Sequence, residues 1–221
     1  MMTSTLPRTD TAVQHDAQQE LDWDPAIHSD DIGVAIDDGI LTLSGVVSSY
    51  SQKVMADHAV RSIHGVRAVA NDITVQVTGE LTDKDIAGSV ATMIESNTML
   101  ADQDIDISIE NGMVTLSGHV SFEFQRRSAE RCVEHLKGVI AVVNRVQIVS
   151  PTAIEHDVRE HIRQALMRNA IIDASKVQID FDHGYVRLHG TVDSLQEKYA
   201  AARAAWRAKG VTRLQNDILV R

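Results

Sequence analysis

Several residue types that mark particular protein classes are scarce in this sequence. The 221-residue chain contains one cysteine, Cys132, so no disulfide can form within it. Only three prolines are present, which argues against long disordered linkers. Aromatic residues make up 4% of the chain, so its core must be aliphatic. No stretch approaches the roughly 20 apolar residues that cross a bilayer, and the sequence therefore predicts no transmembrane segment.

The N-terminus and the charge balance narrow the expected location and partners. No basic region followed by an apolar run opens the chain, which predicts a cytoplasmic location; a periplasmic location is expected only if a leader has been trimmed. The chain has 31 acidic and 21 basic residues, a formal net charge of −10. Because an acidic surface repels polyanions, nucleic acid is not expected as a partner.

The sequence repeats itself when it is shifted by 73 and then by a further 72 residues. Three sets of glycines hold the same spacing from repeat to repeat, and in each repeat an asparagine follows the last of them, at Asn71, Asn144 and Asn216. The matched glycines are Gly39, Gly112 and Gly184, then Gly45, Gly118 and Gly190, then Gly65, Gly138 and Gly210. We therefore predict three modules, at residues 8–79, 80–150 and 151–221.

Each repeat has the same order of periodic segments. A segment of helical period comes first, and two alternating runs follow around a turn such as Asp38-Gly39 or Asn111-Gly112, the dipeptides that suit a two-residue hairpin. A second helical segment then leads to a last strand. This predicts an α+β fold of three tandem αββαβ modules, each a mixed three-stranded sheet with two helices on one face. Which hairpin strand borders the last strand stays open.

The glycines have three expected roles in this fold. Those of the first set lie in the hairpin turns. Those of the second set lie inside a strand, where glycine indicates a bulge or close packing against a helix. Those of the third set are expected to close the second helix in a left-handed conformation.

The clearest copy of the motif, Asn-Gly-Met-Val-Thr-Leu-Ser-Gly at residues 111–118, is completed by Gly138-Val139 and Asn144. This pattern resembles the BON-domain family (bacterial OsmY and nodulation). The third copy departs most, with Arg187 and His189 in place of a threonine and a serine. The resemblance covers residues 10–221. It implies a bacterial, transport-associated protein of the osmotic or envelope stress response, with attachment to phospholipid surfaces and no catalytic apparatus.

No residue pattern indicates catalysis, a cofactor or a metal site. The histidines do not recur from repeat to repeat, and the chain has no Gly-rich phosphate loop and no Cys-x-x-Cys pair. The pairs Ser44-Gly45 and Ser117-Gly118 are interpreted as strand packing positions, not as nucleophiles. Cys132 aligns with alanines on the core face of its helix and is interpreted as a small buried residue. We therefore predict that the protein is not an enzyme.

Charge is distributed unevenly among the repeats. Residues 1–79 carry a net charge of −7 and residues 80–150 of −5, whereas residues 151–221 carry +2. The last helix places Tyr199, Arg203, Trp206 and Arg207 away from its alanine-rich core stripe. Aromatic rings beside arginines suit a membrane headgroup region or a protein interface; alternatively, Trp206 covers an adjacent module.

The sequence thus favours a non-enzymatic, stress-associated binding protein whose third module contacts an anionic phospholipid surface or a partner protein. Two alternatives stay open. One is binding or sensing of a small cation such as potassium through backbone carbonyls. The other is a structural scaffold or oligomer. The oligomeric state itself is not predicted.

Overall fold

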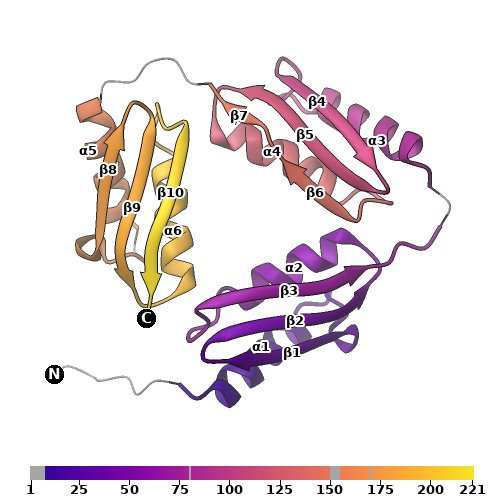
Figure 1. Cartoon of the computed structure of the whole chain (residues 1–221), viewed down its shortest axis with the longest axis horizontal. Helices are drawn as coiled ribbons and strands as arrows, with labels where there is room; N and C mark the ends of the chain where they lie inside the picture. The colour runs from indigo at the N-terminus through magenta and orange to yellow at the C-terminus, as the bar shows by residue number, and fades with distance from the viewer. Residues whose placement is uncertain (1–7, 80, 150–154, 170) are drawn as a thin grey trace.

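The computed structural model describes residues 8–79, 81–149, 155–169 and 171–221, with the backbone alone at residues 155–157. Each repeat folds as a separate α/β module around its own aliphatic core (Figure 1). The predicted α+β class with three tandem modules is confirmed.

Each module consists of a first helix, a hairpin, a second helix and a last strand. The first module comprises α1 (Asp10–Trp23), η1 (Ser29–Asp31), β1 (Ile32–Asp37), β2 (Ile40–Val47), α2 (Tyr50–Val60) and β3 (Ala68–Val75). The second comprises α3 (Asp83–Ser96), β4 (Asp104–Glu110), β5 (Met113–Val120), α4 (Glu123–Glu134), β6 (Ala141–Asn144) and β7 (Gln147–Ile148). The third comprises α5 (Glu155–Met167), η2 (Ala174–Lys176), β8 (Val177–Asp182), β9 (Tyr185–Val192), α6 (Leu195–Trp206) and β10 (Arg213–Val220).

The second hairpin strand is the central strand of every sheet. In the first module β2 pairs antiparallel with β1 and parallel with β3, and β9 stands in the same way between β8 and β10. In the second module the last strand is interrupted, so that β6 and β7 both pair with β5. These pairings answer the question that the sequence left open, because the last strand borders the second strand of the hairpin.

The hairpin turns have the left-handed backbone that the Asp-Gly and Asn-Gly dipeptides allow. Asp38 and Gly39 have φ angles of 46° and 73°, and the other two turns have the same signs. The Asp10 carboxylate at the start of α1 accepts hydrogen bonds from both turn amides, at 2.9 and 3.2 Å. Asp83 does the same for the turn of the second module, at 2.8 and 2.9 Å. The first helix of these modules is thereby fixed to its hairpin.

The glycine within each central strand is required by a close approach of the neighbouring strand. A Cβ at Gly45 would lie 2.0 Å from the Asp31 carbonyl oxygen, and Gly118 and Gly190 have the same relation to Asp104 and Lys176. The close contact is thus with the residue at the entry of the adjacent strand, whereas a bulge or close packing against a helix was predicted.

The third set of glycines does not cap the second helix directly. The helix α2 ends at Val60, and its C-cap Arg61 has an ordinary helical φ of −68°. Gly65 comes after a further turn, with a φ of 100°, and a Cβ there would lie 2.7 Å from the Val13 side chain. The left-handed glycine therefore shapes the connection that passes beneath the first helix.

The repeated asparagine joins the last strand to the second helix. The Asn71 side chain donates to the Lys53 carbonyl oxygen and accepts from the Ile73 amide. Asn144 and Asn216 make the same two contacts in their modules. A buried carbonyl and a buried amide are satisfied by one side chain, which explains why the residue type repeats.

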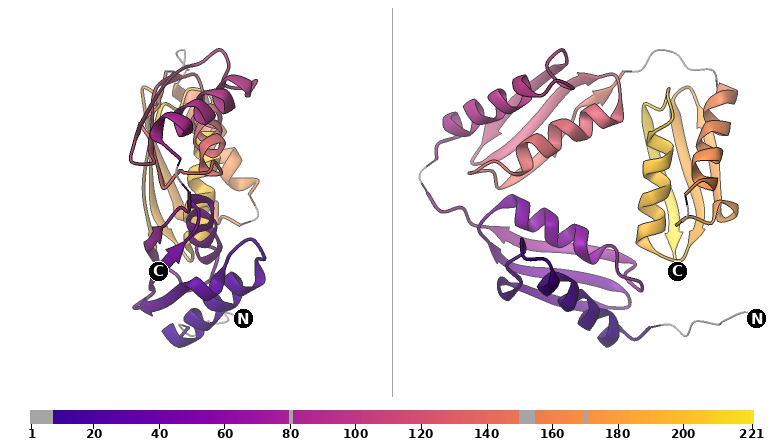
Figure 2. Two further views of the ribbon diagram at one scale, coloured as in Figure 1. Left: turned by 90° about the vertical axis from the view of Figure 1, so that its right-hand side faces the viewer. Right: turned by 180° about the vertical axis from the view of Figure 1, so that it is seen from behind.

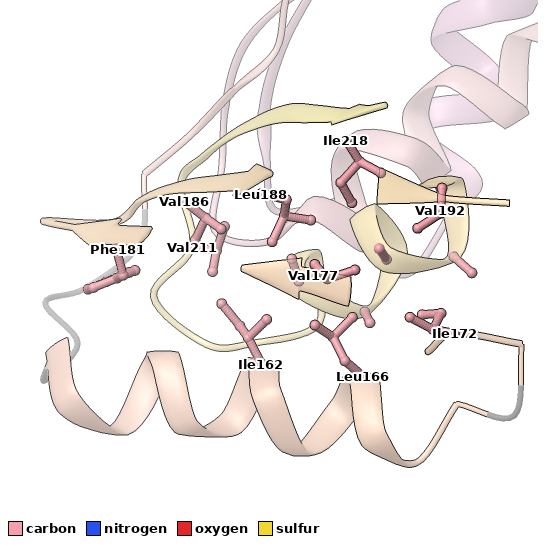
Figure 3. Close-up of a cluster of buried hydrophobic side chains, with 14 of the residues drawn as sticks. Ile162, Leu166, Ile172, Val177, Phe181, Val186, Leu188, Val192, Val211 and Ile218 are labelled. Atoms are coloured by element: carbon pink, nitrogen blue, oxygen red, sulfur yellow. The ribbon is translucent and has the colours of Figure 1, made fainter. Parts of the chain in front are cut away.

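The cores are aliphatic, as the low aromatic content requires. In the third module Ile162 and Leu166 of α5 point from the helix toward Val177, Val186 and other strand residues (Figure 3). Cys132, which its alignment with alanines placed on a core face, is only partly buried and accepts a hydrogen bond from the Asn97 side-chain amide.

The three modules are arranged around a common centre (Figure 1). Helices α2, α4 and α6 lie on the inner side of this ring, whereas α1, α3 and α5 lie on its perimeter. Seen from behind, the helices lie in front of the strands, so the sheets form one broad face of the ring and the helices the other (Figure 2). The second helices therefore form the contacts between modules.

Candidate functional site

The first residue of each second helix lies at a contact between two modules. Tyr50, Glu123 and Leu195 occupy this position in α2, α4 and α6, and they are equivalent under the repeat. We call the contact of the first and second modules seam 1/2, and the other two seam 2/3 and seam 3/1. The three seams each involve the start of one second helix and the end of another, with different side chains at equivalent positions.

Seam 1/2 is closed by Tyr50. Its ring packs against the core of the second module, and burial raises the pKa of its hydroxyl even though a hydrogen bond with the Val142 backbone opposes the shift. The next residue, Ser51, hydrogen-bonds through Oγ to Nδ1 of His135, at 2.8 Å, at the end of α4. This seam joins the start of α2 to the end of α4.

Seam 3/1 is closed by Leu195. Its side chain is 4% exposed and lies in the core cluster of the first module. One helical turn later, the Tyr199 hydroxyl accepts a hydrogen bond from Arg61, and the Arg61 guanidinium stands 5.2 Å from the centre of the Tyr199 ring. A charged group held over an aromatic face and bonded to its hydroxyl makes this a specific contact.

Seam 2/3 contains Trp206, which packs against the second module, but the first residue of α4, Glu123, does not enter a neighbouring core. The Trp206 ring packs partly against the cores of both modules, and the Arg126 guanidinium stands 5.1 Å from its centre. Glu123, at the plug position, turns back onto its own helix and pairs with Arg126 at 2.6 Å and Arg127 at 3.1 Å. An open pocket of about 440 Å³ remains, and we call it the open seam.

Two exposed phenylalanines stand at the mouth of the open seam. Phe122 and Phe124 are 38% and 51% exposed, and their rings stack with centres 5.6 Å apart. The repeat places Phe122 where Ser49 and Ser194 cap α2 and α6 with their side chains. A phenylalanine cannot accept that hydrogen bond, and loss of an N-cap costs about 1 kcal/mol. The Gln125 side chain accepts from the Phe122 amide, which is a different donor from the one that a capping serine satisfies.

The rest of the open seam is basic. Its lining contains five cationic side chains and a single carboxylate, that of Glu123, which Arg126 and Arg127 already share. The cationic side chains are Arg127, Arg131, Arg203, Arg207 and Lys209. Burial lowers the pKa of the Arg203 guanidinium, and the nearby charges of Arg127 and Arg207 lower it further. A bound anion would relieve this repulsion.

The basic surface continues beyond the seam into a groove between α5 and α6. This groove has a volume of about 710 Å³ and is lined by His161, Arg168, Arg203, Arg207 and Lys209, with no carboxylate among its described lining residues. Arg203 and Arg207 therefore lie on the ridge between the two hollows. The cationic surface belongs to both sides of α6, in a protein whose net charge is −10.

The four residues selected from the sequence fall in two kinds of place. Tyr199 and Trp206 are partly buried between modules, at seams 3/1 and 2/3, so Trp206 does cover an adjacent module. Arg203 and Arg207 are exposed beside the open seam. Whether these residues form a binding surface stays a prediction.

Sequence reasoning missed the contribution of the second module. Phe122, Phe124 and Arg127 were not singled out, although the repeat already set the two phenylalanines against serine at the helix cap. That substitution of an aromatic residue for a capping serine was the available signal.

Other site types are not found in the described part of the chain. No group of three or more histidine, cysteine, aspartate or glutamate side chains among those residues could hold a metal ion. None of their helices has the length and apolar character of a membrane span. The cytoplasmic location stays a prediction.

Comparison with known proteins identifies relatives of the modules. The family model described as BON domain matches residues 9–77, 82–150 and 155–221. Osmotically-inducible protein Y of Escherichia coli (strain K12) is 33% identical over 124 residues, which are 53% of this chain and 62% of that protein. The match thus spans less than two thirds of this relative.

Two solved structures of CdsD, a structural protein of the Type III secretion system of Chlamydia trachomatis, also match. Its C-terminal domain is 17% identical with a TM-score of 0.28, covering 98% of this chain and all of that one. The second is 16% identical with a TM-score of 0.27, covering 94% and 91%. Overlap this low carries no functional argument.

Proposed function

The chain belongs to the BON-domain family, and from this we propose that it is a non-enzymatic, osmotic-stress-associated protein that binds anionic phospholipid surfaces through its open seam. The stress association is supported by its similarity to osmotically-inducible protein Y. Its proposed action by binding, and not by catalysis, rests on its membership of the BON-domain family and its similarity to that protein.

One observation carries the choice of ligand. The open seam places two exposed, stacked phenylalanine rings beside Arg203, Arg207 and Lys209, none of which has an ion pair with a carboxylate in the described residues. Aromatic rings at headgroup depth together with unpaired cations are the two components of peripheral binding to an anionic bilayer. Each basic residue near such a surface contributes about 1 kcal/mol.

The charge distribution sets the orientation of the molecule on the surface. The first module, with its net charge of −7, would be repelled by an anionic bilayer, whereas the basic ridge of α6 would be attracted. The protein would therefore approach with the open seam toward the lipid. Binding should weaken steeply as salt screens the attraction.

Flotation with vesicles tests this function. Vesicles that contain phosphatidylglycerol should carry the protein upward at low salt, and pure phosphatidylcholine vesicles should not. The double variant Arg203→Ala with Arg207→Ala should lose most of this binding. The matched control is Arg187→Ala with Arg213→Ala, which removes the same charge from the exposed sheet of the same module.

The control pair should float as the parent does. Equal loss in both double variants would reduce the effect to net charge, and flotation that ignores lipid charge would refute the proposed ligand. Phe124→Ala adds a test of the apolar component, because it removes a side chain that is 51% exposed and should leave folding intact.

A further inference from the structure

The last residue of α1, Trp23, is the most exposed large hydrophobic side chain in the described chain, at 86%. It stands between two shallow hollows of the first module, beside Pro25 and Met55 on one side and Ile63 on the other. A solvent-exposed indole at a helix end, next to further apolar surface, indicates an interaction site.

The surroundings of Trp23 are acidic. Its two hollows contain four carboxylates and one arginine, Arg8, which pairs with Asp16. The carboxylates are those of Asp16, Glu20, Asp22 and Asp24. Hydrogen bonds from Ser29 and Gln18 lower the pKa of Asp22, so this group stays ionised. An anionic bilayer would repel such a surface, and its complement is a cationic pocket with aromatic walls.

The open seam of this protein is a cationic pocket with aromatic walls of that kind. The open seam offers the stacked Phe122 and Phe124 rings, five cationic side chains and about 440 Å³ of open volume. We infer that Trp23 of one copy docks in the open seam of a second copy. The indole stacks on the phenylalanine rings and receives an arginine on its face, while Glu20 and Asp24 pair with the basic rim.

This contact joins two different surfaces, so it does not close on itself within a pair. Each molecule keeps a free Trp23 at one end and a free open seam at the other, and further copies can add. The inference uses the open seam of the proposed function as the receiving pocket, but it does not require that lipid binds there. Lipid and a second copy would compete for the pocket.

Sedimentation of two complementary variants tests the contact. The variant Trp23→Ala keeps the pocket and lacks the inserted side chain. The variant Phe124→Ala with Arg207→Ala keeps Trp23 and lacks the pocket. The parent should associate at low salt, with a mass that rises with concentration past that of two 24.3 kDa chains. Each variant alone should associate at least about 10-fold more weakly, as for a central interface tryptophan.

An equimolar mixture of the two variants should restore one contact only, and so give pairs that do not extend. A mixture that stays monomeric, or a Trp23→Ala protein that associates like the parent, would overturn the inference. The control Met167→Ala removes another exposed apolar side chain, 62% exposed, and should associate normally. Trp23→Ala should still bind phosphatidylglycerol vesicles, so a failure of the self-contact and a failure of lipid binding are distinguishable.

Discussion

Seams 3/1 and 2/3 occupy equivalent places in the ring, but the first is closed by a buried side chain and the second is left open. At seam 3/1, Ser194 caps the helix and Leu195 enters the neighbouring core. At seam 2/3, Phe122 and Glu123 stand at those positions, the side-chain cap is lost and a pocket stays open. A capping residue that is lost in one repeat and kept in the other two is expected at a position under functional constraint.

The largest expected effect comes from removal of the plug at the closed seam. Leu195→Ala should lower the free energy of unfolding by about 2–3 kcal/mol, because it removes a side chain that is 4% exposed within the core of the first module. Urea denaturation measures the loss. Leu219→Ala is the matched control, since that leucine is 66% exposed, and it should change stability by less than about 0.5 kcal/mol. Similar losses in both variants would contradict a closed seam 3/1.

A smaller effect is expected from the polar contact of the same seam. Tyr199→Phe removes the acceptor of the Arg61 hydrogen bond but keeps the ring beneath the guanidinium. Stability should fall by about 0.5–1.5 kcal/mol. Tyr185→Phe is the control, because the Tyr185 hydroxyl bonds Gln215 on the exposed sheet. If Tyr185→Phe lowers the free energy of unfolding by the same amount, the contact at seam 3/1 contributes no more than an exposed hydrogen bond.

The smallest effect concerns pH at seam 1/2. Burial, and then the neighbouring Glu130, raise the pKa of Glu134 above its ordinary value. The folded state therefore favours the protonated carboxyl, and this stabilisation is present below the unfolded pKa of about 4.3 and is lost as pH rises through the folded pKa. Glu134→Gln should be more stable than the parent at pH 7, by less than about 1 kcal/mol because the site is partly exposed.

Paired urea denaturation curves for Glu134→Gln and the parent, recorded at pH 7 and at pH 4, would measure this difference. The gap should shrink at the lower pH. A variant less stable than the parent at pH 7 would show that the attraction of Glu134 to His58 and His135 outweighs its burial.

The sequence predicted the fold well because its constraints are local. A two-residue turn needs positive φ at Asn111 and Gly112, and the close approach of the neighbouring chain needs Gly118. These residues can therefore be identified from their recurrence in the sequence. The order of the strands instead depends on which of the two hairpin strands pairs with the last strand of the module. That choice is made by tertiary pairing, such as that of Met113 in β5 with Ala141 in β6, and no turn dipeptide specifies it.

The candidate site was predicted in part for the same reason. The face of α6 that carries Arg203 and Trp206 follows from helical period alone. That Trp206 meets Arg126 depends on how the third module packs against the second, which helical period does not specify. Helical periodicity identifies a residue that lies off the core face of its own module, but it does not identify the residues of another module that contact it.

Because the modules close into a ring, the contacts between them depend on how many modules the chain has. The end of each second helix lies near the start of another, so the third contact brings the chain back to the first module. Without the first module Leu195 would have no neighbouring core to enter, and without the second module Tyr50 would have none. Gain or loss of one gene segment would therefore alter the shape of the whole assembly, and not merely its length.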